Sequence, residues 1–229
     1  MSRKKQTRGT CVYCDKELTR GGLARHLKTC SERQKAIATA NAGKEGLRQK
    51  IYHIQVQDAW GGDYWLHLEM NGESRLSTLD SYLRAIWLEC CGHMSRFSVG
   101  GGWQGKELSM GAITKRRLEP GLELTHIYDF GTESVTTIKV VDMRVGKPTT
   151  PNPIALMARN EMLEFECIEC GKPAKWYCSQ CLYEDDLWGT LCTEHAKTHP
   201  HDDDGEPIEL VNSPRMGLCG YVGPADPPY

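Results

Sequence analysis

The chain has 229 residues, 39% of them hydrophobic and 25% charged, a composition typical of a globular protein. The formal net charge is only −2, and no apolar run is long enough for a membrane-spanning helix, which excludes a helical membrane protein. The basic start "MSRKKQTRGT" is not followed by an apolar stretch, so we expect no secretory signal and a cytoplasmic location.

Charge is unevenly distributed along the chain. Residues 1–50 contain 13 Lys or Arg and 4 Asp or Glu, whereas the remaining residues contain 15 and 26. Opposite signs favour separate modules, of which the basic one suits an anionic partner. A solvated helix face would give the same charge pattern, so the pattern alone does not decide between the two.

The first segment, residues 1–48, carries a basic arm and a group of metal-ligand residue types. The stretch "CVYCDKELTRGGLARHLKTC" has the spacing Cys-x2-Cys-x11-His-x3-Cys, close to that of ββα zinc fingers. A four-residue step places the last two ligands on one helix face. Three thiolates and one imidazole suit a tetrahedral Zn²⁺ ion. The predicted ligands are Cys11, Cys14, His26 and Cys30.

A finger of this kind could contact nucleic acid. With the ligand histidine at the seventh helical position, Thr19, Gly22 and Arg25 would occupy the base-reading positions, and of these only Arg25 could read a guanine. We therefore expect contacts mainly to phosphates. The candidate residues are Arg3, Lys4, Lys5, Arg8, Arg20, Arg25 and Lys28. A protein partner is the alternative use of a lone finger.

The middle segment, residues 49–146, has the pattern of an α+β domain. Two alternating strand patterns around "GGD" predict a hairpin, and "RLSTLDSYLRAIWLECCG" has the apolar spacing of a helix. Three more strand patterns follow in "HMSRFSVGG", "LELTHIYDF" and "SVTTIKVVDM". The order β-β-α-β-β-β predicts an antiparallel sheet covered by a helix, flanked by small zinc modules at both ends.

Candidate catalytic groups in this segment are His93, His126 and Asp129. An Asp at a tight turn before Phe-Gly is typical of a residue that caps backbone N–H groups. No P-loop, GxSxG or HExxH motif occurs, so a hydrolase or nuclease is only an alternative. We expect Cys90 and Cys91, at the end of the predicted helix, to be buried and inert.

A proline-rich linker, residues 147–160, leads to a Cys-rich tail, residues 161–223, and a disordered end, residues 224–229. The tail spacing, which resembles a B-box or another cross-brace finger, supplies enough ligands for two closed zinc sites. A redox site would need a single Cys-x-x-Cys at a helix start, and disulfides do not suit the cytoplasm. The predicted ligands are Cys167, Cys170, Cys178, Cys181, Cys192, His195, His199 and His201.

Pairs arranged in this way often interleave. We expect Cys167 and Cys170 to share one ion with Cys192 and His195. The second ion would be held by the other four residues, with Cys219 as an alternative to one of the last two histidines. In total we expect about three structural Zn²⁺ ions per chain.

Several stretches resemble the plasmid pRiA4b ORF-3-like family. "YHIQVQD", "YWLHLEM", "HMSRF" and above all "YDFGTESVTTIKVV" are similar to its core over residues 50 to 145. "CIECGKPAKWYC" and "VNSPRMGLCGY" resemble the zinc-bearing tail of a subgroup. In this sequence, however, His195 and His201 stand where members tend to carry Cys, and the N-terminal finger lies outside the family core. The resemblance implies a link to plasmids and mobile elements, but no particular reaction.

These patterns lead to one functional prediction and two alternatives. The prediction is a zinc-binding protein that acts as a nucleic-acid or nucleoprotein binding module, without a membrane partner. The first alternative is an adaptor between proteins in which zinc serves only as scaffold. The second is the enzyme described above.

Overall fold

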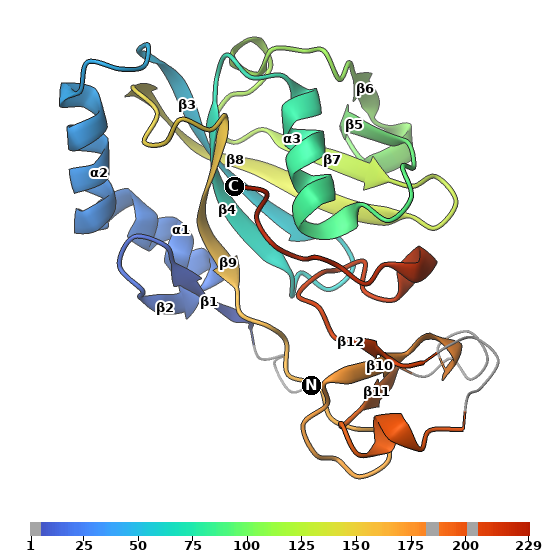
Figure 1. Cartoon of the computed structure of the whole chain (residues 1–229). Coiled ribbons are helices and arrows are strands. Elements are labelled where there is room, and N and C mark those ends of the chain that lie inside the picture. Colours follow the sequence, from blue (N-terminus) through green and yellow to red (C-terminus); the bar gives the residue numbers. More distant parts are fainter. Residues whose placement is uncertain (1–5, 182–187, 201–205) are drawn as a thin grey trace.

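The fold is built on one large antiparallel sheet. The computed structural model describes residues 6–181, 188–200 and 206–229. Nine strands lie in the order β2-β1-β9-β4-β3-β8-β7-β5-β6 (Figure 1). The predicted α+β class with an antiparallel sheet is confirmed. The strands are β1 Arg8–Cys11, β2 Glu17–Thr19, β3 Gln49–Asp58, β4 Trp65–Asn71, β5 Ser95–Val99, β6 Lys106–Leu108, β7 Glu123–Tyr128, β8 Ser134–Gly146 and β9 Ile154–Asn160.

One face of this sheet is covered by α3, Leu76–Leu83, which continues as a π-helical turn over Arg84–Leu88 (Figure 1). The apolar positions that predict the helix, among them Leu79 and Trp87, are fully buried. They pack with inward-facing residues of β3 and β4 such as Ile54 and Leu68. The main core therefore lies between α3 and the centre of the sheet.

Residues predicted to be a linker in fact contribute a strand. β9 pairs with β4 on one side and with β1 on the other, so the finger hairpin β1–β2 extends the main sheet. Two helices follow the hairpin, α1 Arg20–Thr29 and α2 Ser31–Ala42 (blue in Figure 1). The seven-residue strand β9 directly follows prolines and lacks an alternation of apolar and polar residues, so the sequence pattern does not predict it.

The tail forms a separate three-stranded sheet with the order β11-β10-β12. Its strands are β10 Trp176–Cys178, β11 Gly189–Leu191 and β12 Ile208–Glu209. The chain then returns to the main sheet and ends beside α3 (Figure 1). The end predicted to be disordered is ordered here, with the ring of Tyr229 5.7 Å from that of Tyr82. Among the helices that the structure describes, none is both long and apolar enough to cross a membrane.

Candidate metal centres and an adjoining polar groove

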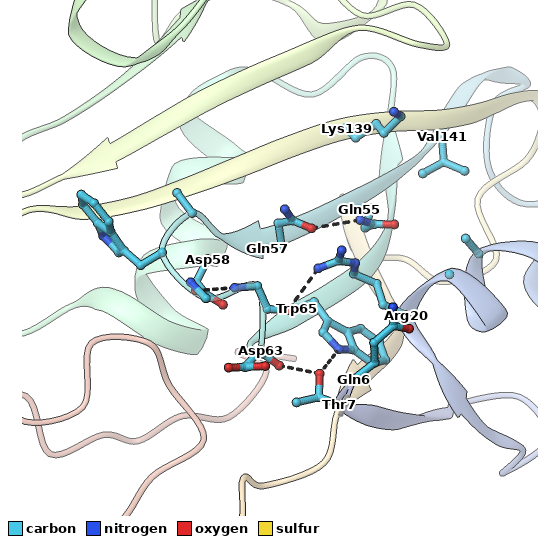
Figure 2. A pocket seen from close by; sticks show the side chains of 16 residues that line it. Gln6, Thr7, Arg20, Gln55, Gln57, Asp58, Asp63, Trp65, Lys139 and Val141 are labelled. Atoms are coloured by element: carbon cyan, nitrogen blue, oxygen red, sulfur yellow. Dashed lines mark hydrogen bonds between the residues drawn. The ribbon is translucent and has the colours of Figure 1, made fainter. Parts of the chain in front are cut away.

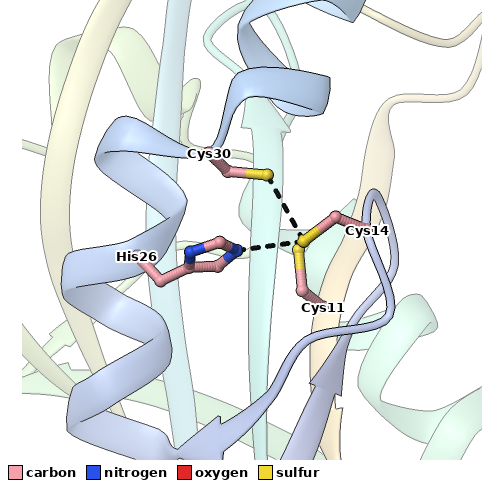
Figure 3. A group of neighbouring side chains, drawn as sticks. All are labelled: Cys11, Cys14, His26 and Cys30. Atoms are coloured by element: carbon pink, nitrogen blue, oxygen red, sulfur yellow. Dashed lines mark hydrogen bonds between the residues drawn. The ribbon is translucent and has the colours of Figure 1, made fainter.

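The four predicted finger ligands converge on one point (Figure 3). Cys11 ends β1, Cys14 lies in the turn after it, and Cys30 lies between α1 and α2. His26 is the seventh residue of α1, the position that the usual zinc-finger geometry would give it. We call these four residues the finger cluster. Because they come from a short contiguous segment, local structure alone brings them together.

The spacing of the ligand atoms in the finger cluster fits a tetrahedral ion. Cys14 Sγ lies 3.2 Å from His26 Nε2 and 3.7 Å from Cys30 Sγ. A tetrahedral zinc with bonds of about 2.0–2.3 Å would separate its ligand atoms by about 3.5–3.8 Å. Burial raises the pKa of the Cys11 thiol to about 11, so its thiolate needs a neighbouring cation. Burial lowers the pKa of His26, which favours the neutral, ligating imidazole.

The finger is packed firmly against the sheet. Trp65 of β4 and Met157 of β9 share a buried cluster with Leu23 and Leu27 of α1. The exposed fraction of Trp65 is 0%. Contact of this kind means that the finger is a fixed part of the domain and not a module on a tether.

A buried ion network strengthens this attachment. Arg33 of α2 donates to Glu69 Oε1 of β4 at 2.5 Å, and Arg144 of β8 donates to Glu69 Oε2 at 2.8 Å. Arg33 also donates to the carbonyl oxygen of Leu27 at 2.8 Å. Burial disfavours the charged form of Glu69 and by itself would raise the pKa of this carboxyl group. The two guanidinium groups more than offset this effect and hold the pKa below its usual value.

A chain of two histidines makes a further link. His67 Nε2 lies 3.1 Å from the carbonyl oxygen of Arg20 and can only donate there, which leaves its Nδ1 as an acceptor. His53 Nε2 lies 2.9 Å from that Nδ1 and therefore donates to it. Burial lowers the pKa of His53 to about 2 and that of His67 to about 4, so both rings are neutral at pH 7.

The tail ligands form two interleaved clusters in the predicted pairing. Cys167 and Cys170 lie with Cys192 and His195, and the Nδ1 atom of His195 is 3.4 Å from Cys167 Sγ. This arrangement ties β10 and β11 to the turn before them.

In the second tail cluster, Cys178 and Cys181 lie with His199, whose Nε2 is 3.1 Å from Cys181 Sγ. The remaining predicted ligand, His201, lies outside the described residues. Cys219, the proposed alternative ligand, is not part of this cluster and lies beside Cys90, Cys91 and His93.

A fourth cluster joins Cys219 to Cys90, Cys91 and His93, one cluster more than the three predicted. We call it the junction cluster, because it links the sheet domain to the C-terminal segment. The prediction that Cys90 and Cys91 are buried is wrong, since Cys91 is exposed and Cys90 half-buried. The helix ends at Leu88, so these cysteines leave its buried face. The only sequence signal was the dense group Cys-Cys-x-His.

The three catalytic candidates do not form one solvent-accessible site. His126 is fully buried, with Nε2 2.8 Å from Asp80 Oδ1. Asp129 accepts a hydrogen bond from the Gly131 backbone N–H at 2.9 Å, as expected of a turn cap, and its φ is +64°. His93 belongs to the junction cluster, 3.3 Å from Asp129.

A polar groove of about 720 Å³ lies beside the finger, between α1, the outer face of β3 and β8, and the loop after β3 (Figure 2). Arg20, Gln57 and Lys139 line it. Trp60 also lines it and is 80% exposed. Gln6, which follows the basic arm in the sequence, also lines the groove.

The loop that forms one wall of this groove is held by a single carboxylate. Asp58 accepts hydrogen bonds from the backbone N–H groups of Gly61, Gly62 and Tyr64 at 2.7–2.8 Å. Arg20 donates to the carbonyl oxygen of Gly62 at 3.1 Å. The groove is therefore preformed. The Arg20–Gly62 hydrogen bond connects the finger helix α1 directly to this loop.

The predicted basic contact residues differ in their surroundings. Arg25 is exposed on α1, whereas Arg8 pairs with Glu17 and Lys28 lies 3.4 Å from Asp142. In the groove, Lys139 lies 3.0 Å from Glu123. The predicted residues Arg3, Lys4 and Lys5 lie outside the described part of the chain.

Comparisons with known proteins add little to this picture. No family model matches the chain, and no curated protein matches it. Among solved structures, a protein of unknown function, MM3350 from Methanosarcina mazei Go1, is 15% identical with a TM-score of 0.40. The match covers 47% of this chain and 67% of that one, a likeness too distant to carry an argument. The resemblance to the pRiA4b ORF-3-like family therefore stays a prediction from the sequence. The chain is an α+β protein, and its described residues form four Cys/His clusters that could hold metal ions.

Proposed function

We propose that the chain is a zinc-dependent nucleic-acid-binding protein whose contact surface is the finger helix α1 together with the adjoining groove. The observation that carries this proposal is the position of the groove. It adjoins the finger, is lined by Arg20 and Lys139, carries the exposed Trp60, and includes Gln6, which follows the basic arm in the sequence.

Each of these features has a role in binding a nucleic-acid strand. Cationic side chains neutralise phosphates and release counterions, which supplies affinity without sequence specificity. The exposed ring of Trp60 offers a stacking platform for a base. The amide side chains of Gln55 and Gln57, which face the groove, can donate to phosphates or base edges. Zinc in the finger cluster would hold α1 in place, and with it Arg20 and Arg25.

The charge distribution supports weak, salt-sensitive binding. Arg8, Lys28 and Lys139 each have an acidic neighbour, which lowers the local potential. The basic arm and Arg25 therefore carry much of the attraction. An adaptor role, with a protein in the groove, is the rival proposal, and association with mobile elements rests on the sequence resemblance alone.

The test is a fluorescence anisotropy titration of zinc-loaded protein with single-stranded DNA, duplex DNA and RNA at two salt concentrations. Lys139→Glu and Arg25→Glu should each weaken binding by about 3- to 10-fold and make the logarithmic salt slope shallower by about one. Trp60→Ala should weaken single-strand binding by about 5- to 150-fold, the range for loss of one stacked base.

The matched control is Lys106→Glu, which makes the same charge change on the exposed edge strand β6, at the far end of the sheet order from the finger. It should leave affinity nearly unchanged. Equal losses in Lys106→Glu and Lys139→Glu would mean that binding is spread over the surface and not placed in the groove. No binding to any of the three probes at low salt would overturn the proposal in favour of the adaptor.

A further inference from the structure

The junction cluster combines two segments that are far apart in the sequence. Cys90, Cys91 and His93 follow the π-helical turn, whereas Cys219 is 128 residues beyond Cys91. The four clusters together include all eleven cysteines of the sequence. The cysteine content therefore leaves no thiol outside a group of metal-ligand type.

The distances within the junction cluster are those of a metal site. Cys91 Sγ lies 2.9 Å from His93 Nε2, 3.5 Å from Cys90 Sγ and 3.7 Å from Cys219 Sγ. His93 Nε2 lies 3.3 Å from Cys219 Sγ. These separations match those in the finger cluster and approach the roughly 3.5–3.8 Å edges of a zinc tetrahedron.

We propose that Cys90, Cys91, His93 and Cys219 bind a fourth metal ion, a thiolate-preferring divalent cation such as Zn²⁺, that fastens the C-terminal segment to the sheet domain. Three sulfur ligands and one nitrogen ligand favour zinc over hard cations such as Mg²⁺ and Ca²⁺. The proposal does not depend on nucleic-acid binding.

Hydrogen bonds outside the junction cluster position the segment that carries Cys219 beside the other three residues of the cluster. Ser213 donates to the carbonyl oxygen of Trp87 at 2.6 Å. Arg215, which is fully buried, donates to Asp129 at 2.6 Å and to the carbonyl oxygen of Thr132 at 2.9 Å. These hydrogen bonds hold the C-terminal segment against the sheet domain independently of any metal ion.

The backbone at Cys219 is unusual. Its φ is +51°, a left-handed conformation that is uncommon for residues other than Gly, Asn, Asp and His. This conformation brings the thiol to the other three ligands. Holding a non-glycine residue there is energetically unfavourable, and a metal bond would compensate for that cost.

Arg215 also lies next to the proposed ligands. Its Nη2 is 3.4 Å from Cys90 Sγ, so it can donate to a thiolate bound to the metal. Zinc with three thiolates and a neutral imidazole has a net charge of −1, which a guanidinium group offsets. Outer partners of this kind orient and tune metal ligands.

The experiment measures zinc per chain by mass spectrometry after reduction, zinc loading and desalting. Cys219→Asn removes the ligand but keeps a residue that tolerates the left-handed backbone, and should lower the zinc content by one equivalent. Cys219→His keeps both a ligand and that tolerance, and should retain the zinc. Cys91→Ser, at an exposed position, should also lose one equivalent.

Cobalt loading provides a second readout. The difference spectrum between wild type and Cys219→Asn should contain the thiolate charge-transfer and d–d bands of one tetrahedral Co²⁺. Unchanged metal content in both Cys219→Asn and Cys91→Ser would overturn the proposal. A Cys91–Cys219 disulfide in protein isolated under reducing conditions would overturn it as well.

Discussion

The finger cluster and the junction cluster have the same ligand types, three thiols and one imidazole. They differ in whether the ligands come from one local segment or from two distant segments of the chain. The finger ligands lie within residues 11–30, and the finger is attached to the sheet by Trp65 and by the Glu69 network. The junction ligands close a loop of more than a hundred residues, and two of them are exposed. A metal in the finger would order a local unit, whereas one in the junction would fasten two distant segments. The attachment of each region can therefore be weakened separately.

The largest effect is expected from breaking the network that attaches the finger. Glu69→Ala would leave the buried Arg33 and the half-buried Arg144 without their carboxylate, and should lower the free energy of unfolding by about 3–5 kcal/mol. Urea denaturation of zinc-loaded protein measures this loss. The control is Glu73→Ala, which removes an exposed partner of Lys115 and should cost about 1 kcal/mol or less. Equal losses in the two variants would mean that the finger does not depend on this network.

An intermediate effect is expected from pH, through the histidine chain between Arg20 and the sheet. The pKa values of His53 and His67 are lowered by burial to about 2 and about 4, below the unfolded value of about 6.5. As pH falls below about 6.5 the unfolded chain gains protons that the folded chain does not. Stability should therefore fall by about 1 kcal/mol for each histidine between pH 6.5 and 5.5, and by about 1.4 kcal/mol per pH unit just below that range.

The slope of the unfolding free energy between about pH 6.5 and 5.5, where both rings stay neutral in the folded chain, measures this effect. Ligand histidines add to the slope in every variant, so the comparison with a His53→Gln, His67→Gln double variant isolates the pair. The double variant should have the shallower slope. Identical slopes would show that these rings are not held neutral.

The smallest effect on global stability is expected from the junction cluster. Ser213 and Arg215 already close the loop, so losing the ion there should change the free energy of unfolding little. Hydrogen exchange should nevertheless rise at residues 216–221 in Cys219→Asn while the finger amides remain protected. Increased exchange in the finger as well would mean that the two regions are one cooperative unit.

Local patterns predicted much of this molecule. The apolar spacing of α3 and the alternation of β3 and β4 predicted the core, and the Cys/His spacing of the N-terminal segment predicted the group of residues that forms the finger cluster. The tail pairing was also expected, because Cys-x2-Cys pairs interleave in known zinc modules. In each case the residues that interact are close in sequence or belong to a repeated spacing.

The other features, which the sequence patterns did not predict, depend on contacts between segments that are far apart in the sequence. β9 is defined by its neighbours β1 and β4, and its own sequence resembles a linker. The junction cluster needs Cys219 to arrive from the far end of the chain. The groove combines residues from α1, β3 and β8, each of which alone has only the pattern of a solvated surface.

The insertion of β9 between β1 and β4 has a consequence for aggregation. If the N-terminal hairpin detached, β9 would become an edge strand with a row of unpaired N–H and C=O groups, a template for pairing with another chain. At the end of the same strand, Arg159 donates to the carbonyl oxygens of Asn212 and Ala225. The N-terminal hairpin thus shields β9 from self-association, and Arg159 holds the C-terminal segment beside the end of the same strand.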